Sequence, residues 1–282
     1  MHFLPGELII VIMKYAKIIV SLTLFLLLYF PLFPRLAAEW SSNADYSHGF
    51  LIPILCGYFI WRKKDELKKT ALYPSAAGII IVFSGLLLYI LGKIGYQDFL
   101  QYFSMLIVLF GLVYAIAGQG VAKITFFPIS YLIFMIPLPQ LVYTNVTFRL
   151  RILSTELAYF FIKLLGINAA REGNIITLPT CTLIIATPCS GIRGLIVFMA
   201  ASLAIGYLFQ KGLAKRLGLF IFSIILALLM NTLRLTLTAF TANLLKLPQV
   251  PASLHDGFGY AVMVLGLVIL FGVNNLLNRG AQ

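Results

Sequence analysis

The sequence predicts an all-α polytopic membrane protein with about eight transmembrane helices, an interfacial amphipathic helix and a small β-hairpin on the outer face. Hydrophobic residues make up 61% of the 282 positions and charged residues only 11%, whereas about a quarter of the residues in a soluble domain are charged. The chain also contains repeated apolar runs that approach the roughly 20 residues needed to cross a bilayer. It shows no internal repeat and no linker, so we expect one integral membrane domain over residues 1–282.

The first predicted span covers residues 18–33 and follows two lysines, Lys14 and Lys17. A removable signal peptide is the competing interpretation, because a basic start, an apolar centre and the small pair at residues 37–38 resemble one. The aromatic, proline-bounded end of the run favours an uncleaved helix. Whether residues 1–12 belong to the natural chain is left open.

Seven further apolar runs follow, and the first of them needs its flanks to reach across a bilayer. They cover residues 50–61, 75–91, 99–117, 124–136, 189–209, 213–240 and 257–277. The polar loop at residues 39–49 carries His48 close to Asp45, and we interpret His48 as an interfacial polar residue, with no further role assigned.

Basic residues are distributed unevenly between the predicted loops. With the N-terminus inside, the cytoplasm receives Lys14, Lys17, the cluster at residues 62–69, Lys123, Lys211, Lys215, Arg216 and Arg279, and the short outer loops hold only Arg35, Lys93 and Lys246. Because basic loops stay in the cytoplasm, we expect an inner-membrane protein with both termini cytoplasmic. The net charge of +12 is then a membrane feature, so we expect contact with lipids and no nucleic-acid partner.

The segment between the fifth and sixth spans differs from the others. Residues 144–165 combine aromatic and aliphatic positions with charged ones, which predicts an amphipathic helix lying in the membrane interface. Residues 174–178 and 181–186 are β-branched runs separated by Pro179-Thr180, which predicts a small hairpin. In the expected orientation this segment lies at the outer face, together with the start of span six, the end of span seven and the start of span eight.

A cysteine begins span six. We expect Thr187 to be the N-cap, Pro188 the first helical residue and Cys189 part of the first turn. Unpaired N–H groups and the positive end of the helix dipole favour a thiolate there. Arg193, one turn further on, adds positive charge. We therefore interpret Cys189 as a nucleophile.

Two further polar positions are expected at the same face. Arg234 lies within the apolar span seven, where an arginine is costly, and Asn231 is placed to orient it; snorkelling to the headgroups is the alternative for Arg234. His255 precedes span eight, where Ser253 and Asp256 form a predicted capping box. The helix dipole disfavours imidazolium, so the ring of His255 is expected to be a neutral proton acceptor.

These groups meet the requirements of acyl transfer. His255 would act as general base and acid, Cys189 would attack a carbonyl, and Arg234 would stabilise the oxyanion. Backbone N–H groups of Ser190 and Gly191 could assist. A transporter or lipid-binding scaffold is the alternative, in which Arg193 and Arg234 bind an anionic headgroup.

No metal site or cofactor is expected. The three cysteines Cys56, Cys181 and Cys189 form neither a disulfide framework nor a cluster with the spacing of zinc ligands. We interpret Cys56 as a small core residue. Cys181 could form a disulfide with Cys189, but this would disable the nucleophile, so an inert Cys181 is favoured and its role stays open.

Four motifs resemble those of the exosortase/archaeosortase family. They are residues 172–179 (EGNIITLP), 188–193 (PCSGIR), 231–234 (NTLR) and 255–259 (HDGFG). The similarity covers most of the chain and is strongest over residues 172–259. Members of this family are regarded as multi-pass membrane cysteine transpeptidases of bacteria and archaea.

The resemblance implies a function and three site residues. The substrates would be membrane-anchored proteins with a C-terminal sorting signal, composed of a Pro-Glu-Pro type motif, a transmembrane helix and a basic tail. The acceptor, lipid- or glycan-linked, is not identified, and a hydrolytic cysteine protease is the runner-up. Cys189 would be the nucleophile, Arg234 the second catalytic residue and His255 the third. Archaeal relatives tend to carry arginine at the position of His255, so this histidine points to the bacterial side.

Overall fold

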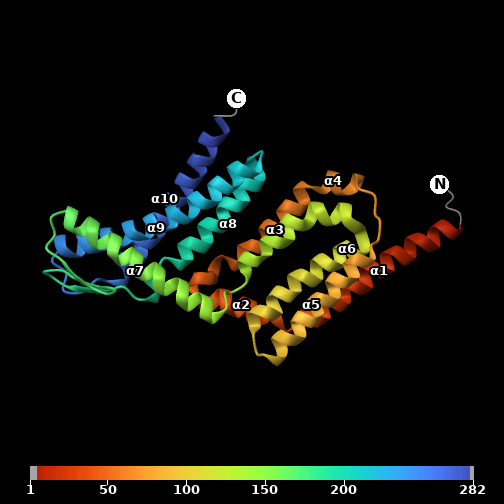
Figure 1. Cartoon of the computed structure of the whole chain (residues 1–282), viewed down its shortest axis with the longest axis horizontal. Coiled ribbons are helices and arrows are strands. Elements are labelled where there is room, and N and C mark those ends of the chain that lie inside the picture. Colours follow the sequence, from red (N-terminus) through yellow and green to blue (C-terminus); the bar gives the residue numbers. More distant parts are fainter. Residues whose placement is uncertain (1–4, 280–282) are drawn as a thin grey trace. The chain divides into compact units, whose positions relative to one another are not determined.

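The computed structural model describes residues 5–279, apart from the side chains of residues 5–15, Lys17, Pro188 and Arg279. Its contacts divide the chain into two compact units, Met1–Pro139 and Gln140–Gln282, and each is described by itself (Figure 1). The single domain over residues 1–282 stays a prediction. The interpretation of residues 1–4 and the side chains of Lys14, Lys17 and Arg279 fall outside the described residues.

The regular elements in the described part of the first unit are all helices. Its elements are α1 (Pro5–Tyr29), α2 (Leu32–Ser42), η1 (Ala44–Phe50), α3 (Leu51–Arg62), α4 (Lys64–Lys69), α5 (Ala76–Ile94), α6 (Asp98–Tyr131) and η2 (Leu132–Met135), where η denotes a 3₁₀-helix. The region expected to be a polar loop at residues 39–49 is helical instead, because α2 continues to Ser42 and η1 follows at once. A local count of polar residues does not detect such short amphipathic helices.

Glycines bring α5 and α6 close together. Gly78, Gly85 and Gly92 lie seven residues apart on α5 and are all buried. A Cβ on Gly85 would lie 2.6 Å from Cγ2 of Val108, and one on Gly92 would lie 2.9 Å from Cβ of Leu100. Helices in a membrane gain little from the hydrophobic effect between them, so small residues that allow close backbone approach stabilise the pair.

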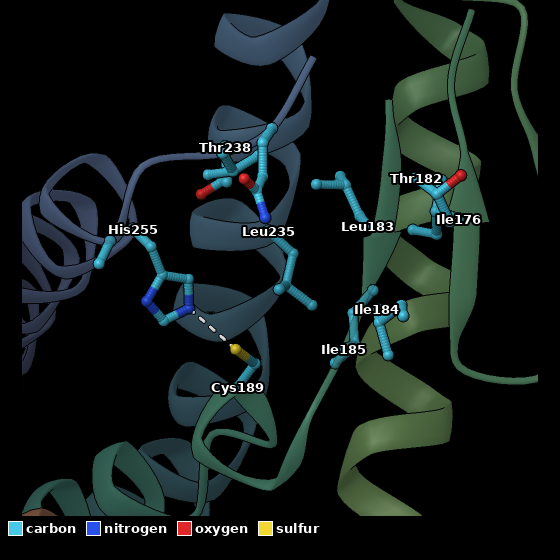
Figure 2. Close-up of a pocket in the computed structure, with 12 residues that line it drawn as sticks. Ile176, Thr182, Leu183, Ile184, Ile185, Cys189, Leu235, Thr238 and His255 are labelled. Carbon is cyan, nitrogen blue, oxygen red and sulfur yellow. Dashed lines mark hydrogen bonds between the residues drawn. The ribbon is translucent and has the colours of Figure 1, made fainter. Parts of the chain in front are cut away.

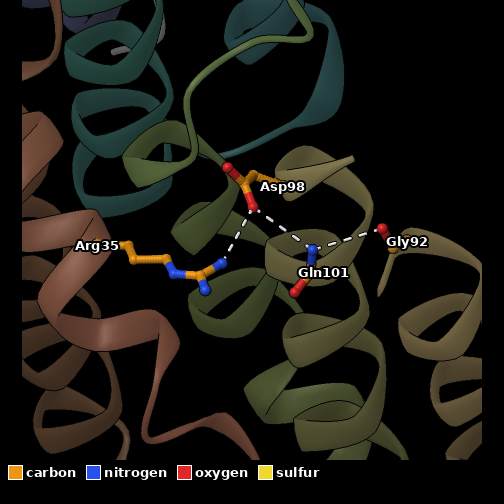
Figure 3. A network of polar contacts seen from close by, with 4 residues as sticks. All are labelled: Arg35, Gly92, Asp98 and Gln101. Carbon is orange, nitrogen blue, oxygen red and sulfur yellow. Dashed lines mark hydrogen bonds and ion pairs between the residues drawn. The ribbon is translucent and has the colours of Figure 1, made fainter. Parts of the chain in front are cut away.

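A polar network lies where α5 passes into α6. Arg35 of α2 donates from Nη1 to Oδ1 of Asp98 at 3.4 Å, and the Gln101 amide donates to that oxygen and to the Gly92 carbonyl, both at 3.4 Å (Figure 3). The Arg35 and Asp98 side chains are more than half exposed, so their ion pair contributes only about 0–1 kcal/mol. The network therefore orients the start of α6 but adds little to the stability of the fold.

The long helix α6 reverses direction at Gly118. This residue has φ 82° and ψ −177°, and a Cβ there would collide with the backbone carbonyl of Tyr73. The rings of Phe110 and Phe126 lie with centroids 5.6 Å apart, although 16 residues of straight helix extend about 24 Å. The helical arms before and after Gly118 therefore fold back against each other.

Three side chains of the first unit bind the backbone that leads out of η2. The Trp40 indole donates to the Met135 carbonyl at 2.8 Å, and the Leu138 N–H donates to the Tyr46 hydroxyl at 3.1 Å. Nε2 of His48 lies 3.0 Å from the Phe134 carbonyl. His48 therefore has a structural contact inside the protein, rather than only an interfacial position.

The second unit contains the polar motifs. Its elements are α7 (Gln140–Leu164), β1 (Ala170–Glu172), β2 (Ile175–Thr177), β3 (Thr182–Ile184), η3 (Thr187–Cys189), α8 (Ile192–Phe209), α9 (Leu213–Leu244) and α10 (Ala252–Arg279). The predicted hairpin is present as β2 and β3, and β1 adds a third antiparallel strand in the order β1-β2-β3. The sheet, α7 and α9 enclose an apolar core that includes Ile162, Ile176, Ile185 and Ala239.

The predicted all-α polytopic class fits the structure, but the count of eight spans is not confirmed. Among the described residues, five helices are long and apolar enough to cross a membrane, or six if the bent pair α1 and α2 forms one span. Helix α3 has only 12 residues, and the two arms of α6 count together as one candidate. Helix α7 buries Thr147, Ser154 and Thr155 together with Ile162, and it exposes Phe148 and Phe160. Its place in the membrane interface stays a prediction.

Candidate active site

Cys189 lies on a short turn in front of the membrane helix. The 3₁₀-turn η3 covers Thr187–Cys189, and α8 begins only at Ile192. The expected helix start is therefore wrong: Ala186 is the N-cap of the turn, no side chain caps it, and the left-handed Gly191 separates Cys189 from α8. The dipole of α8 thus acts on Cys189 less directly than we expected, and Arg193 does not lie one turn further along the same helix.

Asn231 and Gly191 hold this turn in place. Nδ2 of Asn231 on α9 donates to the backbone carbonyl of Cys189 at 3.1 Å. We expected Asn231 to orient Arg234, but its side chain bonds instead to a residue 42 positions away. Gly191 has φ 89°, and a Cβ there would lie 2.8 Å from Cγ of Asn231. The close fit fixes the backbone of Cys189 against α9.

We expect Gly191→Ala to destabilise the protein by about 1–2 kcal/mol, because alanine is strained at positive φ and its Cβ displaces Asn231. The thermal midpoint of the purified protein in detergent measures this effect. Gly194→Ala is the matched control, since a Cβ at Gly194 meets nothing within 4 Å and alanine is the better helix former. Equal midpoints for the two variants would contradict the role of Gly191.

His255 lies directly beside the thiol. Sγ of Cys189 and Nε2 of His255 are 2.9 Å apart, although the residues are 66 positions apart in the sequence (Figure 2). This distance suits a neutral pair, in which the thiol donates to the ring, and an ion pair, in which the ring donates to the thiolate. Helix α10 begins at Ala252, so Ser253 lies inside it and the predicted capping box is wrong. His255 is nevertheless in the first turn, as expected.

Asp256 contacts the other side of the histidine ring. Oδ1 of Asp256 lies 3.2 Å from Nδ1 of His255, so an Nδ1–H can donate to the carboxylate and leave Nε2 free to accept the thiol proton. The Asp256 side chain is 68% exposed, so the bond is weakened by solvent. Sequence reasoning missed this contact, because neighbouring residues on a helix seldom face each other.

Arg234 approaches the pair from α9. Its charge acts on both Cys189 and His255, and its Nη1 would lie 3.7 Å from a Cβ on Gly259, one turn beyond His255 on α10. The position of Gly259 leaves space for the guanidinium. The charge of Arg234 lowers the pKa of the Cys189 thiol, whereas Arg193 lies on α8, beyond the left-handed Gly191.

The surroundings of Cys189 favour its thiolate. Burial raises the pKa of the thiol. The hydrogen bond with His255, the charge of His255 and the charge of Arg234 together lower it by more, so the pKa lies below its ordinary value. A depressed pKa increases the thiolate fraction near neutral pH, and the thiolate is the nucleophilic form.

The pH dependence of alkylation tests this. Only the thiolate reacts, so the iodoacetamide rate at Cys189 should fall as pH drops, with a midpoint below the roughly 8.5 of an ordinary cysteine. In His255→Ala the midpoint should move upward, since burial then opposes ionisation with fewer compensating interactions. Labelling of Cys189 is read by mass spectrometry of the peptide. An unchanged midpoint in the variant would contradict the pairing.

A cavity of about 360 Å³ opens beside the Cys189–His255 pair. Its walls are the β2–β3 hairpin, α9 and the loop that leads into α10 (Figure 2). The lining is mainly apolar and includes Leu183, Ile185 and Leu235, with Thr238 as a polar exception. The sixth, seventh and eighth predicted spans therefore contribute to one site, as the sequence suggested, although the side of the membrane on which it lies is a prediction.

Ser190 and Cys181 complete the set of residues considered around the nucleophile candidate. The Ser190 N–H donates to the Thr187 carbonyl at 3.0 Å and the side chain is buried, so this N–H is already engaged. Cys181 is a free thiol that packs against the core of the second unit and does not line the cavity. Among the described residues, no group of three or more histidine, cysteine and acidic side chains could hold a metal ion.

The fold and the site define an integral membrane protein with a cysteine–histidine pair at a cavity beside its helices. A profile of the transmembrane exosortase family (Exosortase_EpsH) matches residues 40–272. The chain therefore belongs to the transmembrane exosortase family. Comparisons with curated proteins and with solved structures each gave no match.

Proposed function

We propose that this exosortase is a cysteine transpeptidase that cleaves the C-terminal sorting signal of exported proteins and transfers them to an acceptor. The observation that carries the proposal is the 2.9 Å contact between Sγ of Cys189 and Nε2 of His255 at the wall of a cavity. Such a pair between residues remote in sequence supplies a nucleophile and its base within hydrogen-bond reach.

The first half of the reaction forms a thioester. Nε2 of His255 takes the thiol proton, and the Cys189 thiolate attacks the substrate carbonyl. The positive charge of Arg234 favours the negative oxygen of the tetrahedral intermediate. The C–N bond then breaks, the histidine returns its proton to the leaving amine, and the substrate remains attached to Cys189 as a thioacyl group.

The second half releases the product. His255 accepts a proton from the incoming acceptor nucleophile, which attacks the thioester carbonyl, and the Cys189 thiolate leaves and is reprotonated. The bond between Asp256 and Nδ1 keeps the ring oriented through both halves. With water as the acceptor the same residues perform hydrolysis, so the acceptor decides between transpeptidase and protease.

Family membership and the charge distribution support a substrate class and a location. We propose membrane-anchored substrates with a Pro-Glu-Pro type motif, a transmembrane helix and a basic tail, and a lipid- or glycan-linked acceptor. Both termini would lie in the cytoplasm and the site would face the periplasm, as expected from the basic cluster at residues 62–69.

Trapping a thioester tests the proposal. An exported reporter with such a C-terminal signal is co-expressed with the chain, and the membranes are quenched in acid and analysed without reducing agent. We expect a covalent reporter–enzyme species that hydroxylamine releases and that Cys189→Ala does not form. Processing by Cys189→Ala at the normal rate would overturn the proposal.

Two further readouts separate the alternatives. The mass of the processed reporter distinguishes transfer, which adds an acceptor, from hydrolysis, which adds water. If the protein were instead an anion-binding transporter formed around Arg193 and Arg234, its activity would not depend on the Cys189 thiol. Failure of a membrane-impermeant maleimide to label Cys189 from outside would favour this alternative.

A further inference from the structure

The outer strand of the small sheet has one edge that pairs with no other strand among residues 5–279. The strand order is β1-β2-β3, so β3 bonds to β2 on one side only. Backbone N–H and C=O groups need partners, and an unpaired strand edge is a template for another extended chain. The position of this edge therefore decides which segment can pair with it.

The hydrogen-bond register identifies the groups on that edge. The Leu178 N–H donates to the Cys181 carbonyl at 2.8 Å, and the Ile185 N–H donates to the Asn174 carbonyl at 3.0 Å. Bonding alternates along an antiparallel ladder, so residues 181, 183 and 185 face β2. Thr182 and Ile184 therefore direct their backbone N–H and C=O groups to the open edge.

The open edge borders the cavity at the nucleophile. Four successive residues, Thr182 to Ile185, line the cavity together with Cys189 and His255. Side chains alternate between the two faces of a strand, so only every second one points to the same side. Figure 2 shows Leu183 directed toward Leu235, and Thr182 and Ile184 must contribute much of their lining through the backbone. The Ile184 side chain is 67% exposed.

We propose that the sorting segment of the substrate binds as an additional strand on the open edge of β3. This binding presents the scissile carbonyl of the substrate to Cys189. This inference rests on the proposed function and specifies its substrate-binding mode. Bonds to the backbone of Thr182 and Ile184 align an extended peptide without reading its sequence, and the apolar cavity then receives alternate side chains. A peptide in this register is extended before attack, which exposes its carbonyl to the thiolate.

Disulfide cross-linking tests the register. Ile184→Cys is combined with Cys189→Ala, which keeps the reporter uncleaved, and single cysteines are placed at successive positions of the reporter's sorting segment. Only the residue directly opposite on a paired strand lies within disulfide distance, since the next residues on the same face are about 7–8 Å away. We therefore expect the cross-link yield to peak sharply at one reporter position. The same background without the introduced cysteine measures any reaction of Cys56 and Cys181.

The other edge of the same sheet supplies the matched control. Residues 170 and 172 of β1 face β2, so Arg171 occupies the outward position on β1 that Ile184 occupies on β3. It does not line the cavity. Arg171→Cys should give no such peak at one reporter position. Proline lacks the backbone N–H that would bond to the added strand. Ile184→Pro should therefore lower processing roughly fivefold, whereas Arg171→Pro should leave it nearly unchanged.

The outcomes separate the two proposals. Cross-links that form equally at all reporter positions, or equally from both edges, overturn strand addition, while Cys189-dependent processing of the same reporter upholds the transpeptidase. A reporter that is neither processed by the unsubstituted chain nor cross-linked overturns both. Membrane levels of each variant, measured by immunoblot, exclude loss of the protein as the cause.

Discussion

Cys189→Ala and His255→Ala each lower reporter processing by at least about a thousandfold, because removing the nucleophile or its base disables the same proton-transfer unit. The two losses are not additive, since neither residue acts without the other, so the double variant should be no slower than the worse single one. Processing is measured by immunoblot of the reporter over time.

The control for this result is Cys181→Ala. Cys181 is the nearest other cysteine in the sequence and does not line the cavity, so its replacement should leave processing close to the unsubstituted level. A Cys181→Ala variant that is as inactive as Cys189→Ala would show that thiol loss in general, rather than the pair, explains the effect.

Arg234→Ala is expected to lower processing about a hundredfold or more, the usual effect of removing a group that stabilises an oxyanion. Arg234→Lys should recover part of this loss by restoring the positive charge near Cys189. The alkylation midpoint of Cys189 should rise in Arg234→Ala, a readout that a purely structural role would not change.

Arg193→Ala is the matched control for charge. It removes an arginine from the same region of the sequence, but Arg193 lies on α8, separated by the left-handed Gly191 from the turn that carries Cys189. We therefore expect processing within a few fold of the unsubstituted chain. If Arg193→Ala and Arg234→Ala lose processing equally, an anion site formed by both arginines becomes the better explanation.

The residue types of the site could be predicted from the sequence, but its local geometry could not. Cys189, Arg234 and His255 could be singled out because an arginine within an apolar helix is costly and because a cysteine and a histidine stand at the starts of two apolar runs; their catalytic roles stay predictions. The break at Gly191 was not, since a helix beginning at residue 189 or at residue 192 gives the same apolar pattern. Helix boundaries are the least determined part of such patterns.

Contacts over long sequence distances explain the other differences. Asn231 has Arg234 as its near neighbour on α9, and local spacing favours that pair, yet its hydrogen bond goes to Cys189. The third strand, β1, is only three residues long and is a strand only because it pairs with β2. The repeat of Gly78, Gly85 and Gly92 is visible in the sequence, but only the structure shows that it faces α6.

The reversal of α6 sets the parity of membrane crossings. A single crossing between Asp98 and Met135 would put these residues on opposite sides of the bilayer, whereas the fold-back at Gly118 returns the chain to the side from which it came. The bend lies beside Thr70 and Tyr73, just after the basic cluster at residues 62–69. Lys123 therefore shares one end of the first unit with that cluster, and the torsion angles of one glycine bring these basic residues together.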